Sequence, residues 1–250
     1  MKLSGNTIFI TGGGSGIGRG LAEALHKLGN KVIIAGRRRS HLDAVTAANP
    51  GMEAVELDIT DPTSINQVAA KLMYPDLNVL INNAGIMQPD AAAGKIDNAL
   101  MVATITTNLM GPIRMTSALI EHLKGKSDAV AAYTSSVLGF VPLAATAVYS
   151  STKAALHSYI LSQRFMLRDT TVRVLEIAPP WVRTELMNSQ EVEQAMPLEQ
   201  FIEETIAVLR TDADEILVDA AKPLRANAGP NEHGLVNGFN AQMTAISAGG

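Results

Sequence analysis

The sequence contains no cysteine, few aromatic residues and no apolar run long enough to cross a bilayer. Without cysteine there is no disulfide, no thiolate nucleophile and no cysteine-ligated metal, and we identify no other set of metal ligands. The first five residues, Met-Lys-Leu-Ser-Gly, are not a signal peptide, so we expect a cytoplasmic protein. The net charge of −4 argues against a surface that binds nucleic acid.

The 250 residues are 47% hydrophobic and 18% charged, which is enough to bury a large core. Short segments that are apolar on both faces alternate with segments whose apolar residues recur with the period of a helix. We predict strands at 7–10, 31–35, 53–57, 78–81, 128–134 and 171–177, and helices at 21–28, 39–48, 63–73, 96–123 and 147–167. This alternation predicts an α/β fold, a parallel sheet with helices on both faces.

The regular alternation stops after Pro180. We expect a mixed loop and helix at 181–196, a helix at 198–210 and another helix at 212–221. The tail at 227–250 is rich in Gly, Asn and Ala, and we predict one short strand in it near Leu235 and Val236.

The stretch from Thr11 to Gly18 reads Thr-Gly-Gly-Gly-Ser-Gly-Ile-Gly and lies between the first strand and the first helix. Gly12 allows a sharp turn, Gly16 leaves room for a pyrophosphate, and Gly18 lets the helix pack closely on the sheet. Free N–H groups at a helix start attract phosphates. A plain glycine-rich turn is the alternative, and a P-loop is disfavoured because no Lys-Ser or Lys-Thr pair follows. We predict a dinucleotide site formed by Gly12, Gly14, Ser15, Gly16, Ile17 and Gly18.

Arginines follow the second strand, where a dinucleotide fold that binds NAD usually has a carboxylate. That position is Gly36, and Arg37 and Arg38 come next. A guanidinium binds a 2′-phosphate that a carboxylate would repel, so NADP is favoured, with NAD as the alternative cofactor. The arginines are otherwise a basic loop or helix start. After the third strand, Asp58 and Ile59 are candidates to contact the adenine, although Asp58 is equally well read as a turn or helix cap.

Asn82-Asn83-Ala84-Gly85 follows the fourth strand. Side-chain amides at this position are suited to tie neighbouring strand ends together and to line the floor of the cofactor site. Asn and Gly also dominate ordinary turns, which is the alternative reading. We predict that Asn83, Ala84 and Gly85 contact the cofactor.

Tyr149 and Lys153 are four residues apart in the helix predicted at 147–167, so they share one face. A tyrosine with the usual pKa near 10 is a poor acid or base at neutral pH. A neighbouring ammonium, aided by an oxidised nicotinamide, is expected to lower the pKa of Tyr149 so that it exchanges a proton with a substrate oxygen. The alternative is an exposed helix face.

Two further polar residues belong to the predicted catalytic set. Ser136 ends the fifth strand, and its hydroxyl is placed to hydrogen-bond the same substrate oxygen, or else to cap the strand end. Asn108 lies inside the pattern at 96–123, where asparagine is an unfavourable helix residue. Its amide is expected to open the helix and hold a water, unless it is only a tolerated polar position.

Taken together, these residues resemble the short-chain dehydrogenase/reductase family, in its single-domain branch. The motifs occur in the family's order and spacing over residues 5–185. The resemblance implies a Rossmann-type, doubly wound sheet of seven strands and an NAD(P)-dependent oxidoreductase that acts on an alcohol or a carbonyl. It also implies one NAD(P)-binding domain over 1–250, in which a segment at about 180–210 covers the substrate.

The resemblance assigns roles residue by residue. Tyr149 resembles the general acid/base, Ser136 its partner on the substrate oxygen, and Asn108 the residue that anchors a water. Lys153 resembles the residue that binds the nicotinamide ribose and tunes the tyrosine. The positions of Pro179, Val182 and Thr184 correspond to contacts with the nicotinamide.

The chain departs from the family pattern in two places. Pro180 stands where the family usually has glycine, which stiffens the loop, removes one N–H donor and puts the carboxamide contact in question. The tail reads Val-Asn-Gly-Phe-Asn at 236–240 instead of the usual Val-Asp-Gly-Gly ending, which often builds a tetramer contact. We therefore expect a homodimer through the two long helices, at about 98–123 and 148–167, with a tetramer as the alternative.

The residues expected to face the substrate are mostly apolar, and Arg183 is the one basic residue among them. The apolar residues are Met87, Leu138, Phe140, Val141, Leu143, Trp181, Leu186 and Met187. The predicted substrate site consists of Leu138 and Trp181 from this set together with Ser136 and Tyr149. We expect a small or medium apolar ketone, aldehyde or secondary alcohol. A cofactor-binding sensor or scaffold without turnover is the alternative function, and an epimerase is disfavoured by the length of the chain.

Overall fold

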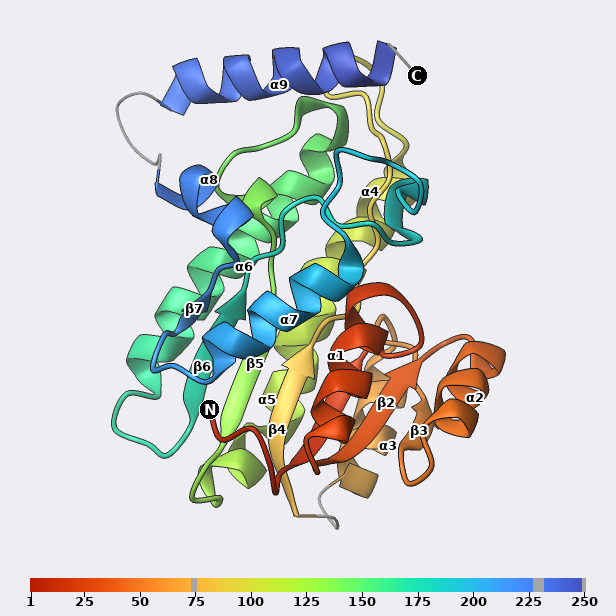
Figure 1. The fold of residues 1–250 in the computed structure, drawn as a ribbon, viewed down its shortest axis with the longest axis vertical. Helices are drawn as coiled ribbons and strands as arrows, with labels where there is room; N and C mark the ends of the chain where they lie inside the picture. Colours follow the sequence, from red (N-terminus) through yellow and green to blue (C-terminus); the bar gives the residue numbers. More distant parts are fainter. Residues whose placement is uncertain (73–75, 227–231, 249–250) are drawn as a thin grey trace.

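The protein is built on a seven-stranded sheet in which every neighbouring pair of strands is parallel. The computed structural model describes residues 1–72, 76–226 and 232–248 (Figure 1). The strand order is β3-β2-β1-β4-β5-β6-β7. The strands are β1 (Thr7–Thr11), β2 (Lys31–Gly36), β3 (Glu53–Glu56), β4 (Leu77–Asn82), β5 (Val130–Thr134), β6 (Arg173–Ile177) and β7 (Glu215–Ile216).

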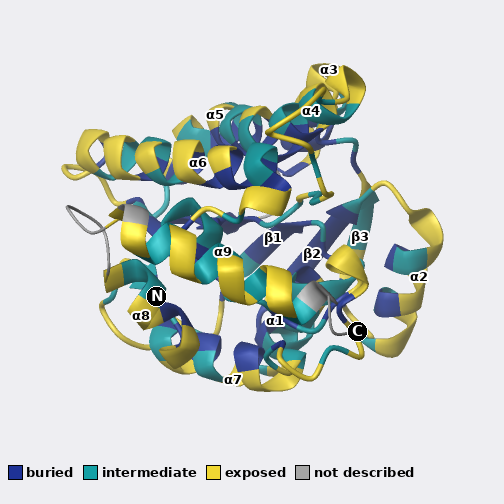
Figure 2. Cartoon of the chain, turned by 90° about the horizontal axis from the view of Figure 1, so that it is seen from above, coloured by how far each residue is buried: buried dark blue, intermediate teal, exposed yellow. Residues whose placement is uncertain are grey.

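Helices cover both faces of the sheet (Figures 1 and 2). One face packs against α1 (Gly16–Lys27), α2 (Arg39–Ala48) and α7 (Leu198–Leu209). The other packs against α3 (Pro62–Leu72), α5 (Gly111–Lys124) and α6 (Ala147–Met166). The remaining helices are α4 (Asn98–Ile105), α8 (Lys222–Ala226) and α9 (Glu232–Ala248).

The central strand β1 shows why the chain folds this way. Ile8 and Ile10 are fully buried on the face covered by α1, and Phe9, between them, is fully buried on the opposite face. A strand that is apolar at every position is stable only between two layers of helices. The predicted doubly wound parallel sheet is therefore confirmed, with most boundaries within two residues of the expected ones; Met73, the predicted end of one helix, lies outside the described residues.

The long helical pattern at 96–123 is divided into three parts. Helix α4 ends at Ile105, five residues from Thr106 to Met110 form a π-helix, and α5 continues from Gly111. Asn108, which is buried, lies in the π-helix. The helix therefore departs from α geometry at this asparagine, as expected, and the side chain of Asn108 bonds the backbone of Ile86, outside the helix.

The prediction of a helix at 212–221 was wrong. Glu215 and Ile216 form β7 at the edge of the sheet, pairing with Glu176 and Ile177, and only Asp219–Ala221 form a short 3₁₀ turn. Ile216 is buried in the core against β6. Burial and pairing at the sheet edge outweigh the local helix propensity, which is a weak determinant for so short a segment.

The prediction of a strand near Leu235 and Val236 was also wrong, because both residues lie in α9. Figure 2, which views the molecule from above, shows α9 crossing over the ends of β1 and β2. The part of the tail at 227–231 and the last two residues lie outside the described residues. Within the described residues, no helix combines the length and apolar character needed to span a membrane.

Candidate active site

A cleft of about 970 Å³ opens where the parallel strands end. Its lining includes the residues that follow β1, β2, β4, β5 and β6, as well as residues of α6 and α9. In a doubly wound sheet, ligands bind at this edge, because the loops that leave the strands diverge there. The cleft thus brings together the glycine turn and the Tyr149 and Lys153 pair, although some 130 residues separate them in the sequence.

The glycine turn is shaped by close contacts that only glycine allows. Gly12 has a φ of +69°, and a Cβ on it would lie 2.9 Å from the Cα of Ala84. A Cβ on Gly18 would lie 2.3 Å from the carbonyl oxygen of Gly12. Gly18 does not line the cleft but fixes α1 against the end of β1, as the sequence indicated.

The start of α1 suits a pyrophosphate. Ser15 is the N-cap residue, but its side chain does not cap the helix and instead accepts a hydrogen bond from Arg38. The backbone turns at Gly16, where φ is +52°, and Ser15, Gly16 and Ile17 line the cleft. A Cβ on Gly16 would meet only Thr184, at 3.5 Å. Uncapped N–H groups at the positive end of a helix form an anion site, so the residues present fit the phosphates of a dinucleotide.

The ends of β1 and β4 are held together by Asn83. The hydroxyl of Thr11 accepts hydrogen bonds from the N–H groups of Asn83 and Ala84, at 3.0 and 3.1 Å. The amide of Asn83 in turn donates to the carbonyl oxygens of Thr11 and Gly12. Asn83, Ala84 and Gly85 all line the cleft, so these contacts fix its floor, as expected from the sequence.

Arg37 and Arg38 both line the cleft, but their surroundings differ. Arg38 donates to the hydroxyl of Ser15 at 2.9 Å and forms an ion pair with Glu185 at 3.4 Å, which joins the glycine turn to the loop after β6. Arg37 makes no hydrogen bond or ion pair with the described residues. Ile59 lines the cleft as well.

Asp58 takes the role of a turn cap, which was one of its two readings. Its carboxylate accepts hydrogen bonds from the N–H and the hydroxyl of Thr60, at 2.9 and 2.7 Å. Those bonds, with some help from the charge of Arg37, hold the pKa of Asp58 below its usual value. The side chain does not line the cleft.

Tyr149 and Lys153 lie together in the cleft and are almost completely buried, with 7% and 4% of their surfaces exposed. The Nζ of Lys153 is 5.5 Å from the centre of the Tyr149 ring and donates to the carbonyl oxygen of Thr134 at 2.8 Å. Burial raises the pKa of Tyr149 to about 12, although its hydrogen bond with Ser136 opposes the shift. Desolvation is the main cause of this shift. The expectation that the ammonium of Lys153 and an oxidised nicotinamide together lower this pKa stays a prediction.

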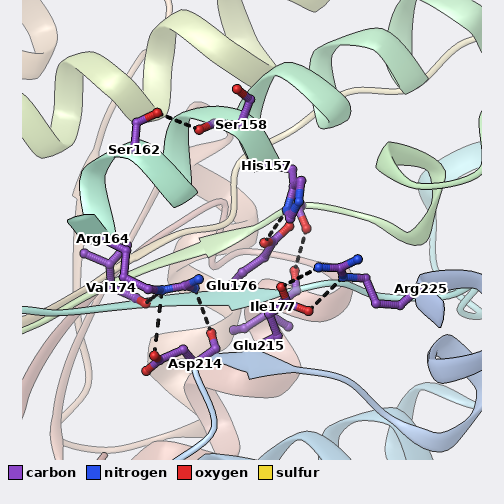
Figure 3. Close-up of polar contacts among 11 residues, drawn as sticks. His157, Ser158, Ser162, Arg164, Val174, Glu176, Ile177, Asp214, Glu215 and Arg225 are labelled. Atoms are coloured by element: carbon purple, nitrogen blue, oxygen red, sulfur yellow. Dashed lines mark hydrogen bonds and ion pairs between the residues drawn. The ribbon is translucent and has the colours of Figure 1, made fainter. Parts of the chain in front are cut away.

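Burial also lowers the pKa of Lys153 to about 8, and the charge of Glu176 opposes that shift. Glu176 is fully buried in β6 and lies behind the cleft in an ionic network (Figure 3). One of its oxygens lies 2.7 Å from the Nδ1 of His157, while the neighbouring Glu215 accepts two hydrogen bonds from Arg225. His157, Glu176 and Glu215 have the spacing of metal ligands, but Arg225 already supplies positive charge to Glu215.

Ser136 and Asn108 approach the Tyr149 and Lys153 pair from two sides. Ser136 lines the cleft and also caps a 3₁₀ turn by accepting from the N–H of Leu138 at 3.1 Å. Asn108 lies just outside the lining. Its side chain holds both the N–H and the carbonyl oxygen of Ile86, at 2.9 and 2.8 Å, which fixes the loop after β4.

The loop after β6 supplies one wall of the cleft. Pro179, Pro180, Trp181, Val182 and Thr184 all line it. Of the other apolar residues expected to face the substrate, Met87, Leu138, Leu143, Leu186 and Met187 line the cleft as well.

Three residues expected on the substrate side lie elsewhere. Val141 is completely buried, and Phe140 packs edge-on against His157 and under the guanidinium of Arg225. The guanidinium of Arg183 donates to three carbonyl oxygens of its own loop, those of residues 192, 193 and 195. None of the three lines the cleft, and no basic side chain is left to bind an anionic substrate on this wall.

Comparison with known proteins agrees with this geometry. A family model described as short chain dehydrogenase matches residues 6–195. The chain belongs to the short-chain dehydrogenase family. It is therefore an NAD(P)-dependent oxidoreductase, and the fold that the sequence predicted is the fold of that family.

Individual relatives cover most of the chain. It is 36% identical over 234 residues to "Uncharacterized oxidoreductase DltE" of Bacillus subtilis (strain 168), covering 90% of this chain and 92% of that one. It is 34% identical over 194 residues to the NADP-dependent 3-hydroxy acid dehydrogenase of Schizosaccharomyces pombe (strain 972 / ATCC 24843), covering 74% of each. A solved short chain dehydrogenase from Burkholderia cenocepacia J2315, in complex with NADP, superposes with a TM-score of 0.79 at 27% identity, covering 99% and 98%.

The dehydrogenase cleft also has a wall that sequence reasoning missed. Phe239, Asn240, Met243 and Thr244 of α9 line it, together with Leu224 of α8. Val236, Phe239, Met243 and Ile246 recur at intervals of three and four residues, which is the signal of an amphipathic helix. Two glycines and two asparagines in α9 obscured that period, because they are poor helix formers.

Proposed function

We propose that this dehydrogenase uses NADP(H) to interconvert a small or medium apolar ketone or aldehyde and the corresponding alcohol. The observation that carries the proposal is that one cleft holds the glycine turn, the buried Tyr149 and Lys153 pair and the guanidinium of Arg37, which has no hydrogen-bond partner among the described residues. The bound nicotinamide supplies or accepts a hydride at its C4 atom. We further propose that 1–250 acts as one domain, with 180–210 covering the substrate, in the cytoplasm.

In this proposal, Tyr149 is the general acid and base. Because burial raises its pKa to about 12, it holds its proton at neutral pH and is suited to donate that proton to a carbonyl oxygen. The hydroxyl of Ser136 orients the same oxygen by a hydrogen bond. The protonated form of Tyr149 serves carbonyl reduction, and alcohol oxidation requires its deprotonated form, so the rate of oxidation should increase with pH.

Lys153 and Asn108 position the reacting groups. The Nζ of Lys153 holds the nicotinamide ribose and places a positive charge beside the tyrosine ring, while its hydrogen bond to the carbonyl of Thr134 fixes its height in the cleft. Asn108 restrains the loop after β4 through Ile86 and holds the water that the family resemblance assigns to it. Pro179, Val182 and Thr184 form the contact surface for the nicotinamide.

NADP is the proposed cofactor because two arginines and no carboxylate follow β2. Arg37 is available to bind a 2′-phosphate, whereas Arg38 already contacts Ser15 and Glu185. The B. cenocepacia structure was solved in complex with NADP, which supports the same choice. Fluorescence titration with NADPH and NADH tests it, and equal affinities for the two would rule it out.

The outer face of α6 supports the proposal of a homodimer. Leu161, Phe165 and Met166 are exposed on it, with Phe165 at 64%, and small residues lie between Leu161 and the start of the helix. Exposed apolar residues that repeat along one helix indicate a contact with a second helix. Light scattering tests this expectation, and a clean monomer would contradict it.

The alternative function is a sensor that binds NADP(H) without turnover. Both functions require the glycine turn, but only the enzyme requires an acid at the bottom of the cleft. Assay of purified protein with NADPH and a panel of ketones and aldehydes separates them: turnover of neutral, apolar members supports the enzyme. Turnover of anionic substrates alone would overturn the proposed substrate class.

A further inference from the structure

Helix α9 forms the outer side of the cleft, opposite the floor made by the strand ends. It crosses above β1 and β2 in the view of Figure 2, and Phe239, Asn240 and Met243 line the cleft. The family model ends at residue 195, so α9 lies outside the part of the chain that defines the family. Its position must be explained by contacts within this chain.

The side chain of Asn240 binds α9 to a loop of the protein body. The amide of Asn240 accepts a hydrogen bond from the N–H of Ala144 and donates one to the carbonyl oxygen of Pro142, at 2.9 Å. It thus pairs with the 142–144 loop as a neighbouring strand would. The loop is itself fixed to α6, because the N–H of Leu143 donates to the hydroxyl of Ser150, the residue after Tyr149.

The apolar face of α9 borders the cleft through Phe239 and Met243. Val236, Phe239, Met243 and Ile246 share one face, yet each is only half-buried, and no described residue of α9 is buried. In α1, by contrast, the same spacing places Leu21 and Leu25 completely inside the core. An apolar helix face that borders a cleft gains further burial when an apolar ligand fills it.

The charge of α9 limits which ligand this can be. Beyond its first two residues, the described part of α9 carries no charged side chain. On the opposite wall, Arg183 is bound to backbone carbonyls, and Leu186 and Met187 are partly exposed at 40% and 39%. The space between the two walls is therefore suited to a neutral, apolar chain.

We propose that α9 is the outer wall of the substrate site, that Phe239 and Met243 contact the apolar end of the substrate, and that Asn240 fixes this wall in place. The inference rests on the proposed function for the identity of the reacting carbonyl. It adds that the site favours longer apolar carbonyl compounds over short ones, because only the longer ones reach α9. Asn240 is a specificity-determining residue and takes no part in proton transfer.

Trp181 provides a test that does not depend on turnover. It is the only tryptophan of the chain and lines the cleft, so its fluorescence reports on ligands that enter. Wild type, Asn240→Ala and Asn237→Ala are titrated with linear methyl ketones of increasing length in the presence of NADP. Asn237 is the matched control, because it is exposed on the same helix and does not line the cleft.

We expect wild-type affinity to rise with ketone length and Asn240→Ala to weaken binding of the long ketones about tenfold, with little effect on the short ones. Asn240→Asp keeps the acceptor for Ala144 but loses the donor to Pro142, so an intermediate effect is expected. Asn237→Ala should resemble wild type. Thermal unfolding and NADPH titration verify that each variant is folded.

The outcomes separate the two proposals. If long ketones bind as expected but no ketone is reduced with NADPH, the proposed role of α9 is supported and the proposed reaction is contradicted. If the ketones are reduced but Asn240→Ala affects short and long ones equally, the proposed reaction is supported and the proposal that α9 forms the outer wall of the substrate site is contradicted. If the affinity of the wild-type protein for methyl ketones does not increase with their chain length, the proposed role of α9 is contradicted as well.

Discussion

The floor and the outer wall of the cleft are held in place in different ways. The floor consists of backbone in tight contact: Gly18 approaches the carbonyl of Gly12, and Asn83 joins the ends of β1 and β4. The wall is a half-buried helix, and the amide of its Asn240 binds the 142–144 loop. The floor keeps its shape through tight backbone contacts, whereas α9, none of whose described residues is buried, is a part in which a different substrate can be accommodated at small cost to the fold.

The largest effect is expected at Tyr149, which lines the same cleft as the floor and the wall. Replacing it by phenylalanine removes the proton donor, so turnover should fall by roughly 10²- to 10⁴-fold. The affinity for NADPH should hardly change, because the ring stays in place. The measurement is kcat with a ketone that the wild type reduces, together with a fluorescence titration of NADPH.

The matched control is Tyr159→Phe on the same helix. Tyr159 is half-buried, packs edge-on against Tyr133 and does not line the cleft. If the two variants lost activity to the same extent, the loss would reflect damage to α6, and the role of Tyr149 as an acid would be refuted.

Adding one methyl group to a glycine should have opposite effects in the two regions. Gly18→Ala forces a Cβ to within 2.3 Å of a backbone oxygen and should cost about 1–3 kcal/mol of unfolding free energy. Gly238 of α9 has no atom within 4 Å of an added Cβ, so Gly238→Ala should strengthen the helix by about 0.5–1 kcal/mol. Urea unfolding measures the first change, and hydrogen exchange of α9 amides the second.

This pair of variants is a direct test of the contrast. A loss of protection in Gly238→Ala would mean that α9 packs more tightly than described. An unchanged stability of Gly18→Ala would mean that the floor adjusts its backbone, and the rigid floor would be refuted.

Arg37 and Arg38 should differ in their effect on cofactor preference. Arg37→Ala removes a guanidinium that has no described hydrogen-bond partner, and the preference for NADPH over NADH should fall roughly ten- to a hundredfold. Arg38→Ala should have a smaller effect on the preference, because Arg38 is already engaged by Ser15 and Glu185. The measurement is the dissociation constants of NADPH and NADH for each variant. A larger loss of preference in Arg38→Ala than in Arg37→Ala would contradict the assignment of Arg37 as the residue that binds the 2′-phosphate.

The smallest effect concerns pH. Because burial lowers the pKa of Lys153 from 10.5 to about 8, the lysine loses its proton in the folded protein well before it would in the unfolded chain. Below pH 8 the buried charge of Lys153 lowers the free energy of unfolding. As the pH rises from about 8 toward 10.5 this destabilisation disappears, so the free energy of unfolding should increase. For carbonyl reduction, kcat/KM should be constant below pH 8 and decrease above it.

Glu176→Gln sharpens this prediction. Glu176 raises the pKa of Lys153, so its loss should move the decrease in kcat/KM to lower pH. Glu121→Gln, on the exposed face of α5, is the control and should leave the profile unchanged. A profile that does not move in Glu176→Gln would show that the ionic network behind the cleft does not influence Lys153.

The sequence predicted the fold and most of the cleft lining because those features depend on neighbouring residues. Ile8, Phe9 and Ile10 specify a strand buried on both faces, and the glycines that follow specify the turn. Asp58 shows the limit of such reasoning, since an adenine contact and a turn cap require the same residue in the same place. The hydrogen bonds from Thr60 show the turn cap, and the adenine contact stays a prediction.

The parallel sheet, the glycine turn and the four-residue spacing of Tyr149 and Lys153 could be predicted from the sequence, because each follows from the periodicity of a strand or a helix. Three features could not: Glu215 and Ile216 extend the sheet, burial raises the pKa of Tyr149, and α9 lines the cleft. All three depend on residues distant in the sequence: β6 beside β7, the layers that desolvate Tyr149, and the 142–144 loop that binds Asn240. Burial and long-range hydrogen bonds outweighed local propensity at each of these places.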